Sequence, residues 1–133
     1  DDGIASAPAE APQAVKEIIW AGNEIVGKPY RYGGGHGDFE DSAYDCSGTV
    51  SYALAGANLL QRPRDSRSFF RYGYGGKGKW VTIYTNSGHA YMTVAGIRLD
   101  TSAAGDRGGA KGPRWRPLRQ SNKGYRLRHP RGL

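Results

Sequence analysis

Cys46 is the only cysteine of this 133-residue chain, and it stands in the run Tyr-Asp-Cys-Ser-Gly-Thr-Val, where a helix is predicted to begin. A single cysteine can form neither an intrachain disulfide nor a zinc site of several thiolates. At a helix N-terminus, unpaired backbone N–H groups and the helix dipole stabilise the thiolate, which is the nucleophilic form of the side chain. His89 follows a glycine turn at the start of a predicted strand, where its imidazole can face a cleft. A thiolate and an imidazole together predict nucleophilic acyl transfer.

A third group that orients the imidazole is expected on the strand after His89. In one register of the predicted hairpin His89 faces Ser102, and in a register shifted by one residue it faces Asp100. Both registers place Asp100 on the same face of the sheet as His89, because directly opposed residues share a side. A carboxylate there would fix the tautomer of the ring and stabilise the imidazolium. Thr101 or Ser102 takes this place if the strand pairs differently.

Each of these residues also has an ordinary structural interpretation. A lone cysteine such as Cys46 is often an inert small hydrophobe, and His89 at a strand start is often structural. Asp45 is expected to cap the helix, and its charge opposes thiolate formation at Cys46. Tyr30 and Tyr32 are typical of an aromatic wall. The functional interpretation depends on the combination of these residues and their order in the sequence.

Apolar periodicity predicts two helices followed by an antiparallel meander, which is an α+β arrangement within one domain. A disordered lead-in is expected over residues 1–10, and residues 61–79 are expected to form a loop at the edge of the site. The predicted regular elements are helices over residues 12–26 and about 46–60, strands over 80–84, 90–94 and 97–101, and a last edge strand over 124–129.

The formal net charge is +7, and most of it lies in the C-terminal third. Residues 104–133 contain nine Lys and Arg and a single acid, Asp106. Such a segment suits a polyanionic surface, whether nucleic acid, anionic lipid or an anionic wall polymer, or else forms a solvated face. No apolar run approaches the roughly 20 residues of a membrane-spanning helix.

Two motifs carry a family resemblance. Gly27-Lys-Pro-Tyr-Arg-Tyr-Gly-Gly34 followed by Asp45-Cys-Ser-Gly48 resembles the N-terminal signatures of the NlpC/P60 cell-wall cysteine peptidases. Ser87-Gly-His89 before a strand is similar to the histidine region of that family. The resemblance implies a papain-like α+β fold, with N-terminal helices packed on a small antiparallel sheet. It implies one catalytic domain over residues 11–133, to which residues 104–133 add a basic C-terminal extension.

The resemblance also implies what the chain does. It implies a cofactor-free bacterial cysteine endopeptidase that is secreted or lies in the cell envelope and cuts peptidoglycan stem peptides. The usual bond joins γ-D-glutamate to a diamino acid. We expect a monomer without nucleic-acid partners, whose basic C-terminal third suits anionic wall polymers. No metal ligand set is expected.

The residue roles carry over position by position. Cys46 becomes the nucleophile, His89 the base and Asp100 the third catalytic residue. The substrate-binding residues are then Tyr30, Asp45, Ser47 and His36. Of these, Tyr30 lines the site near the thiol, Asp45 and Ser47 contact the stem peptide, and His36 shapes substrate access or competes as a second imidazole.

Two alternatives remain at this stage. The chain could be a non-catalytic module that binds the cell wall or another polyanion, which the basic C-terminal segment with Trp115 and Tyr125 favours. It could also be an amidase or acyltransferase that uses the same Cys–His pair on another substrate.

Overall fold

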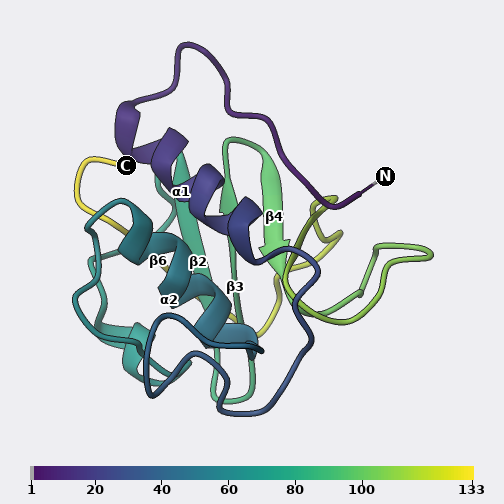
Figure 1. Ribbon diagram of the computed structural model, residues 1–133. Coiled ribbons are helices and arrows are strands. Elements are labelled where there is room, and N and C mark those ends of the chain that lie inside the picture. The colour runs from purple at the N-terminus through teal and green to yellow at the C-terminus, as the bar shows by residue number, and fades with distance from the viewer. Residues whose placement is uncertain (1) are drawn as a thin grey trace.

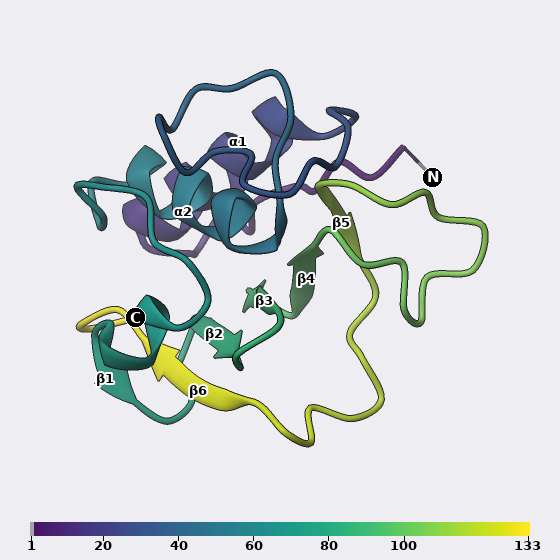
Figure 2. The ribbon, with the colours of Figure 1, turned by 90° about the horizontal axis from the view of Figure 1, so that it is seen from below.

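The computed structural model describes residues 2–133, and in it two helices cover one face of a six-stranded antiparallel sheet (Figure 1). The strand order is β1-β6-β2-β3-β4-β5. Figure 2 shows the two helices together on one side of the strands. No helix among the described residues is long and apolar enough to cross a membrane. The elements are α1 (Gln13–Ile25), α2 (Cys46–Gly56), the 3-10 helix η1 (Ser68–Arg71), β1 (Tyr74–Gly75), β2 (Val81–Thr85), β3 (Ala90–Val94), β4 (Ile97–Asp100), β5 (Arg114–Arg116) and β6 (Arg126–His129).

The helices pack through the apolar faces that the sequence predicts. In α1, Val15, Ile18 and Ile19 are fully buried at helical spacing. The second helix begins at Cys46 as predicted but ends at Gly56, four residues before the predicted end. It stops there because Asn58 adopts a left-handed conformation, with φ of 61°, which does not continue a right-handed helix.

The three central strands confirm the predicted meander. Val94 pairs with Ile97 in the β3–β4 hairpin, which is the register that places position 89 opposite position 102. On the face toward the helices the strands bury apolar side chains such as Ile83, Met92 and Leu99, together with Thr85 at the end of β2. The opposite face, which we call the outer face, carries polar and aromatic side chains and continues toward the candidate site.

The C-terminal third is part of the sheet rather than an extension added to a finished domain. β5 pairs with β4 at one edge. β6 lies between β1 and β2, so the prediction of an edge strand over residues 124–129 is wrong in its position. The edge strand on that side is the two-residue β1, which lies within residues 61–79, expected to form a loop. So short a strand leaves no alternation pattern in the sequence.

Residues 2–10, within the segment expected to be a disordered lead-in, contact the rest of the domain, while residue 1 lies outside the described residues. The side-chain amide of Asn23 exchanges two hydrogen bonds of 2.9 Å with the backbone of Ala5. The backbone N–H of Trp115 donates to the carbonyl of Gly3 over 2.9 Å. These contacts hold the segment against α1 and β5. Local sequence does not reveal them, because the partners are distant in the chain.

Candidate active site

Cys46 is the first residue of α2, and Asp45 is its N-cap. The Asp45 backbone is extended, and its Oδ1 accepts a hydrogen bond of 2.8 Å from the Gly48 N–H. This satisfies one of the orphan donors of the first turn. The Cys46 N–H has no hydrogen-bond partner within residues 2–133 and remains free for a substrate oxygen. The half-buried thiol therefore lies beside an unpaired donor at the positive end of the helix dipole.

The glycine-rich connection before Asp45 packs directly against the helix start. The Asp45 N–H donates to the Gly34 carbonyl over 3.1 Å, and the Gly33 N–H donates to Asp45 Oδ2 over 3.0 Å. A Cβ atom on Gly48 would lie only 2.1 Å from the Gly34 carbonyl oxygen. Glycine at position 48 is therefore required by close packing. The same packing places Tyr30, which bridges to Tyr44, at the mouth of the site.

His89 lies between the thiol and a buried carboxylate. Its Nε2 is 2.8 Å from Asp100 Oδ1, and its side chain is 20% exposed. Burial alone would lower the pKa of His89, but the hydrogen bond to Asp100 and the interaction with Cys46 raise it to about 9. Because Nε2 is engaged by Asp100, Nδ1 is the nitrogen left to exchange a proton with the Cys46 thiol. The geometry matches the order thiol, imidazole, carboxylate.

Asp100 is fully buried and kept ionised by its surroundings. Arg98 and Arg119 both donate to its Oδ2, the latter over 3.1 Å, and the Ser102 N–H donates to Oδ1 over 3.0 Å. Burial raises the pKa of Asp100, but the hydrogen bond and charge of His89, with help from Ser102 and Arg98, lower it below its usual value. Ser102 thus contacts Asp100 through its backbone and does not replace it beside His89.

The two arginines are site residues that sequence reasoning missed. Arg98 shares a sheet face with Asp100 two residues away, so strand alternation could have paired them. Arg119 arrives from a loop far along the chain, and no local pattern predicts its contact.

His36 forms a separate cluster with Asp45 and Ser47. Its Nε2 is 2.8 Å from Asp45 Oδ1 and 3.0 Å from Ser47 Oγ. The hydrogen bond to Asp45 raises the pKa of His36 although burial opposes the shift. The ring of His36 is thus engaged by Asp45 and Ser47, whereas the pKa of His89 responds to Cys46 itself. The two imidazoles therefore have different partners, and of the two it is His89 that interacts with the thiol.

Two cavities flank the Cys46–His89 pair, and Tyr30 borders both. One of about 280 Å³ is lined by the His36 cluster, the thiol and two residues of the segment after α2, Asp65 and Ser66. The other, of about 340 Å³, lies beside His89 and includes Lys111, whose Nζ is 4.2 Å from the centre of the Tyr30 ring. Burial, with the nearby Cys46 and Asp45, raises the pKa of Tyr30. The reactive pair therefore lies in a cleft open on both sides.

All seven predicted site residues lie at this end of the molecule. His89 is hydrogen-bonded to Asp100 and has its pKa raised by Cys46, and His36, Asp45 and Ser47 form a second group of hydrogen-bonded residues. Among residues 2–133 no group of three His, Cys, Asp or Glu side chains could hold a metal ion.

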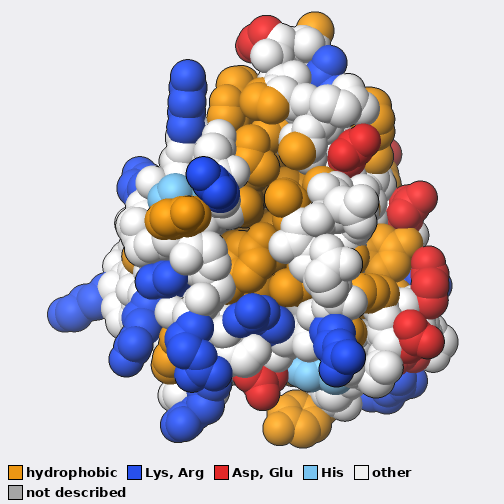
Figure 3. Space-filling model, turned by 90° about the vertical axis from the view of Figure 1, so that its left-hand side faces the viewer, with side chains coloured by type: hydrophobic (Ala, Val, Ile, Leu, Met, Phe, Trp, Pro, Cys, Tyr) orange, Lys and Arg blue, Asp and Glu red, His pale blue; other side chains and the backbone are white. Residues whose placement is uncertain are grey.

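The basic residues of the C-terminal third divide into internal and exposed groups. Arg116 is buried and bonds to Asp106 over 2.8 Å and to the Asp100 carbonyl over 2.8 Å. Arg107, Lys123 and Arg131 are exposed. Figure 3 shows most Lys and Arg side chains of one face gathered toward the left and bottom, and most acidic ones along the right edge. Part of the positive charge thus stabilises the fold, and the rest lies on the surface.

Two solved structures from Mycobacterium tuberculosis resemble this chain. The peptidoglycan hydrolase RipB (Rv1478) is similar with a TM-score of 0.64 and 23% identity, over 94% of this chain and 72% of that one. Rv1477, described as a hypothetical invasion protein, is similar with a TM-score of 0.60 and 26% identity, over 95% of this chain and 69% of that one. No family model and no curated protein matches the chain. The two likenesses confirm the predicted NlpC/P60-like α+β fold.

Proposed function

We propose that this protein is an NlpC/P60-type cysteine endopeptidase that hydrolyses peptidoglycan stem peptides, at the bond between γ-D-glutamate and a diamino acid. The observation that carries the proposal is the contact chain from Cys46 through His89 to the buried Asp100. The likeness of the fold to RipB, a peptidoglycan hydrolase, supports the substrate class. On this proposal the protein works in the cell envelope or outside the cell.

The first half of the reaction forms an acyl-enzyme. The Cys46 thiol gives its proton to His89 Nδ1, and the thiolate sulfur attacks the carbonyl carbon of the scissile amide. The resulting oxyanion accepts a hydrogen bond from the free Cys46 N–H, with Tyr30 beside it. The C–N bond then breaks, and the departing amine takes the proton from Nδ1. A thioester remains on Cys46.

Water completes the reaction. His89 Nδ1 removes a proton from a water molecule, whose oxygen attacks the thioester carbon. The C–S bond breaks, releasing the carboxylic acid, and the sulfur leaves as a thiolate paired with the imidazolium. Throughout, Asp100 holds Nε2–H and stabilises the positive charge on the ring. Its own arginine contacts keep this carboxylate in place.

The substrate lies in the cleft on both sides of the thiol. The cavity with His36, Asp45 and Ser47 receives one side of the stem peptide, and the cavity with Lys111 and Ser102 receives the other. Asp45 Oδ1 already accepts from the Gly48 N–H and from His36, and Ser47 is buried. The His36 imidazole, which is 29% exposed, is therefore the polar group of this cluster most open to the substrate.

Digestion of sacculi and defined muropeptides, read by mass spectrometry, tests the proposal. Wild type should release fragments that identify the bond cut, and Cys46→Ala should release none. A Cys46→Ala protein that digests as well as wild type would exclude the thiol mechanism. Fragments cut at the glycan–peptide amide would assign an amidase instead. If wild type binds sacculi of several chemistries but cuts none, the binding-module alternative takes over.

A further inference from the structure

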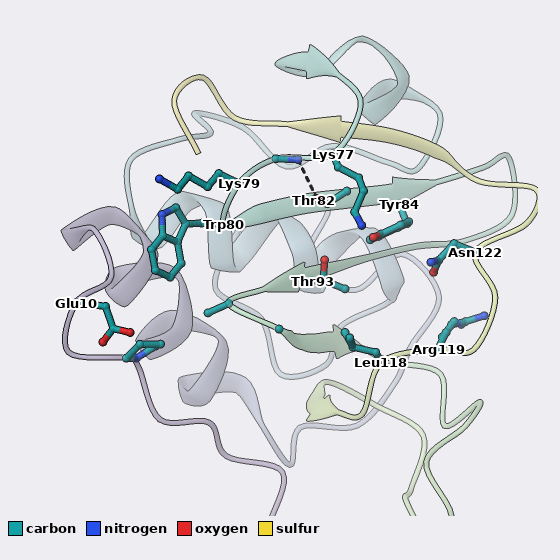
Figure 4. A pocket seen from close by; sticks show the side chains of 14 residues that line it. Glu10, Lys77, Lys79, Trp80, Thr82, Tyr84, Thr93, Leu118, Arg119 and Asn122 are labelled. Atoms are coloured by element: carbon teal, nitrogen blue, oxygen red, sulfur yellow. Dashed lines mark hydrogen bonds between the residues drawn. The ribbon is translucent and has the colours of Figure 1, made fainter.

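A larger hollow of about 600 Å³ lies on the outer face of the sheet, and we call it the outer groove (Figure 4). Its floor is formed by β2 and β3 through Thr82, Tyr84 and Thr93. Its lining contains none of the residues of the Cys46 cleft proposed to act on the substrate. It is bordered by the segment before β2, by the N-terminal segment, by the turn between β3 and β4 and by the loop after β5.

The outer groove is rich in hydrogen-bond donors that the protein itself does not use. Tyr84 is only 5% exposed, yet its hydroxyl has no hydrogen-bond partner within residues 2–133, and Figure 4 shows it directed into the groove. The side chains of Thr93, Lys77 and Lys79 also have no partner in that range. Lys77 and Lys79 are exposed, and the Tyr84 hydroxyl reaches the surface of the groove, so these donors are open to a ligand. The lining therefore favours a ligand with many oxygen acceptors.

The charge and the aromatic surface of the groove further restrict the chemical class of its ligand. Lys77, Lys79 and Arg119 line the groove with the single acid Glu10. Because Arg119 is paired with Asp100, the two lysines supply the positive charge offered to a ligand. Trp80 is half-buried at the edge and offers a flat apolar surface beside Lys79. Aromatic faces contact the apolar faces of sugar rings, while ammonium groups attract anions.

We propose that the outer groove binds an anionic polymer of the cell wall, a glycan or polyol chain that carries carboxylate or phosphodiester groups. Lys77 and Lys79 contact the anionic groups, Tyr84 and Thr93 donate to chain oxygens, and Trp80 packs on the chain. The wall location rests on the proposed function, whereas the preference for an anion rests on the groove alone.

The position of the groove gives such binding a use. It lies on the outer face of the sheet, and neither Cys46 nor His89 lines it. A polymer held there leaves the cleft open to stem peptides. Binding would then keep the enzyme near its substrate and raise the effective substrate concentration without changing the reaction.

Binding assays with the Cys46→Ala protein, which leaves the wall intact, test this proposal. The probes are whole sacculi, sacculi freed of phosphodiester polymers by hydrofluoric acid, polygalacturonate and neutral dextran. The test variant is Lys77→Gln with Lys79→Gln. The matched control removes two exposed charges outside the groove, Arg107→Gln with Lys123→Gln. Thermal unfolding shows whether both variants are folded.

We expect the test variant to bind sacculi about 10-fold more weakly and the control to bind as the parent does. If the parent protein no longer binds sacculi after hydrofluoric acid treatment, the ligand is a phosphodiester polymer. If it binds polygalacturonate, the ligand is a carboxylated polymer. Equal loss in both variants, or equal binding to dextran, overturns the proposal. The proposal is also overturned if an oligonucleotide displaces the protein from sacculi while neither the carboxylated nor the phosphodiester polymer does so. The same two lysine changes are also made in the protein that retains Cys46. If this variant digests soluble muropeptides at the wild-type rate, the weaker binding to sacculi is independent of catalysis, so a failure of the binding proposal and a failure of the catalytic proposal can be told apart.

Discussion

Arg98 and Asp100 are two residues apart on β4, and their fully buried side chains form an ion pair on the outer face of the sheet. The same Asp100 carboxylate contacts His89 through its other oxygen. The arginine is itself held by the Pro117 carbonyl, which accepts from its Nε over 2.8 Å. The group that orients the imidazole is therefore fixed by the sheet and by the loop after β5, and the Cys46 cleft depends on the C-terminal third.

Replacing Arg98 with methionine should destabilise the fold strongly. Among residues 2–133, the change leaves the buried Asp100 with Arg119 and His89 as its remaining side-chain ion-pair partners. Breaking a buried ion pair from one side typically costs about 3–5 kcal/mol. Urea unfolding followed by circular dichroism measures the loss. The control is Arg107→Met, at an exposed position, for which we expect a change within about 0.5 kcal/mol. Similar unfolding midpoints for the two variants would contradict the account of Asp100.

Replacing Asp100 with asparagine should slow the reaction and change its pH dependence. The hydrogen bond to Asp100 helps to raise the pKa of His89 to about 9. Without the carboxylate charge, that pKa falls, and the alkaline limb of kcat/KM moves to lower pH. The rate should fall by about 10²–10⁴-fold, as when a triad carboxylate is lost. The measurement is kcat/KM on one muropeptide between pH 5 and pH 10.

A control separates catalysis from folding in this variant. Asp100→Asn must keep a cooperative thermal transition under the assay conditions. A folded variant with an unshifted alkaline limb would show that Asp100 does not set the pKa of His89.

The stability of the protein should itself depend on the protonation of His89. Its folded-state pKa of about 9 lies above the ordinary value of 6.5, so the folded state binds the proton more tightly than the unfolded state. This stabilisation is fully present below pH 6.5 and is lost as the pH rises through 9. The free energy of unfolding of wild type should therefore fall across this range. We expect His89→Gln to remove most of the fall, and His36→Gln to remove less. Equal slopes for wild type and His89→Gln would refute the linkage.

The sequence predicted the parts of the site that local patterns encode. Cys46 at a helix start and His89 after a glycine turn follow from capping and strand rules. Asp100 followed from alternation, because either hairpin register puts it on the face of His89. The exact register was left open in the sequence, and the structure resolves it through the Val94–Ile97 pair.

Other parts depend on contacts between distant segments, which no local pattern reports. Arg119 reaches Asp100 from a loop 19 residues away. β6 inserts between β1 and β2 because a long connection returns the chain to the middle of the sheet, and the sequence of β6 is the same whether it lies inside or at an edge. The ordered contacts of Ala5 with Asn23 are missed for the same reason.

Alanine at position 48 should disrupt the start of α2. The added Cβ would meet the Gly34 carbonyl oxygen at 2.1 Å, so the connection before Asp45 or the helix must shift. Such overpacking typically costs about 1–3 kcal/mol and here also displaces Cys46. The matched control is Gly37→Ala, in the same connection, where an added Cβ meets nothing within 4 Å. Unfolding midpoints and activity should fall for Gly48→Ala alone. Equal effects of the two changes would argue against close packing as the reason for this glycine.

The two imidazoles should differ in their effect on the reactivity of Cys46. The thiolate reacts with iodoacetamide and the thiol does not, so the alkylation rate between pH 6 and pH 7 reports the ionised fraction. His89 interacts with Cys46, whereas the His36 ring is hydrogen-bonded to Asp45 and Ser47. His89→Ala should therefore slow alkylation by at least about 10-fold, since the imidazole that takes up the thiol proton is then missing. His36→Ala should change it much less, although its loss also unpairs Asp45 beside the thiol. If both variants slow alkylation equally, His36 shares the role of the base and the assignment of His89 alone is wrong.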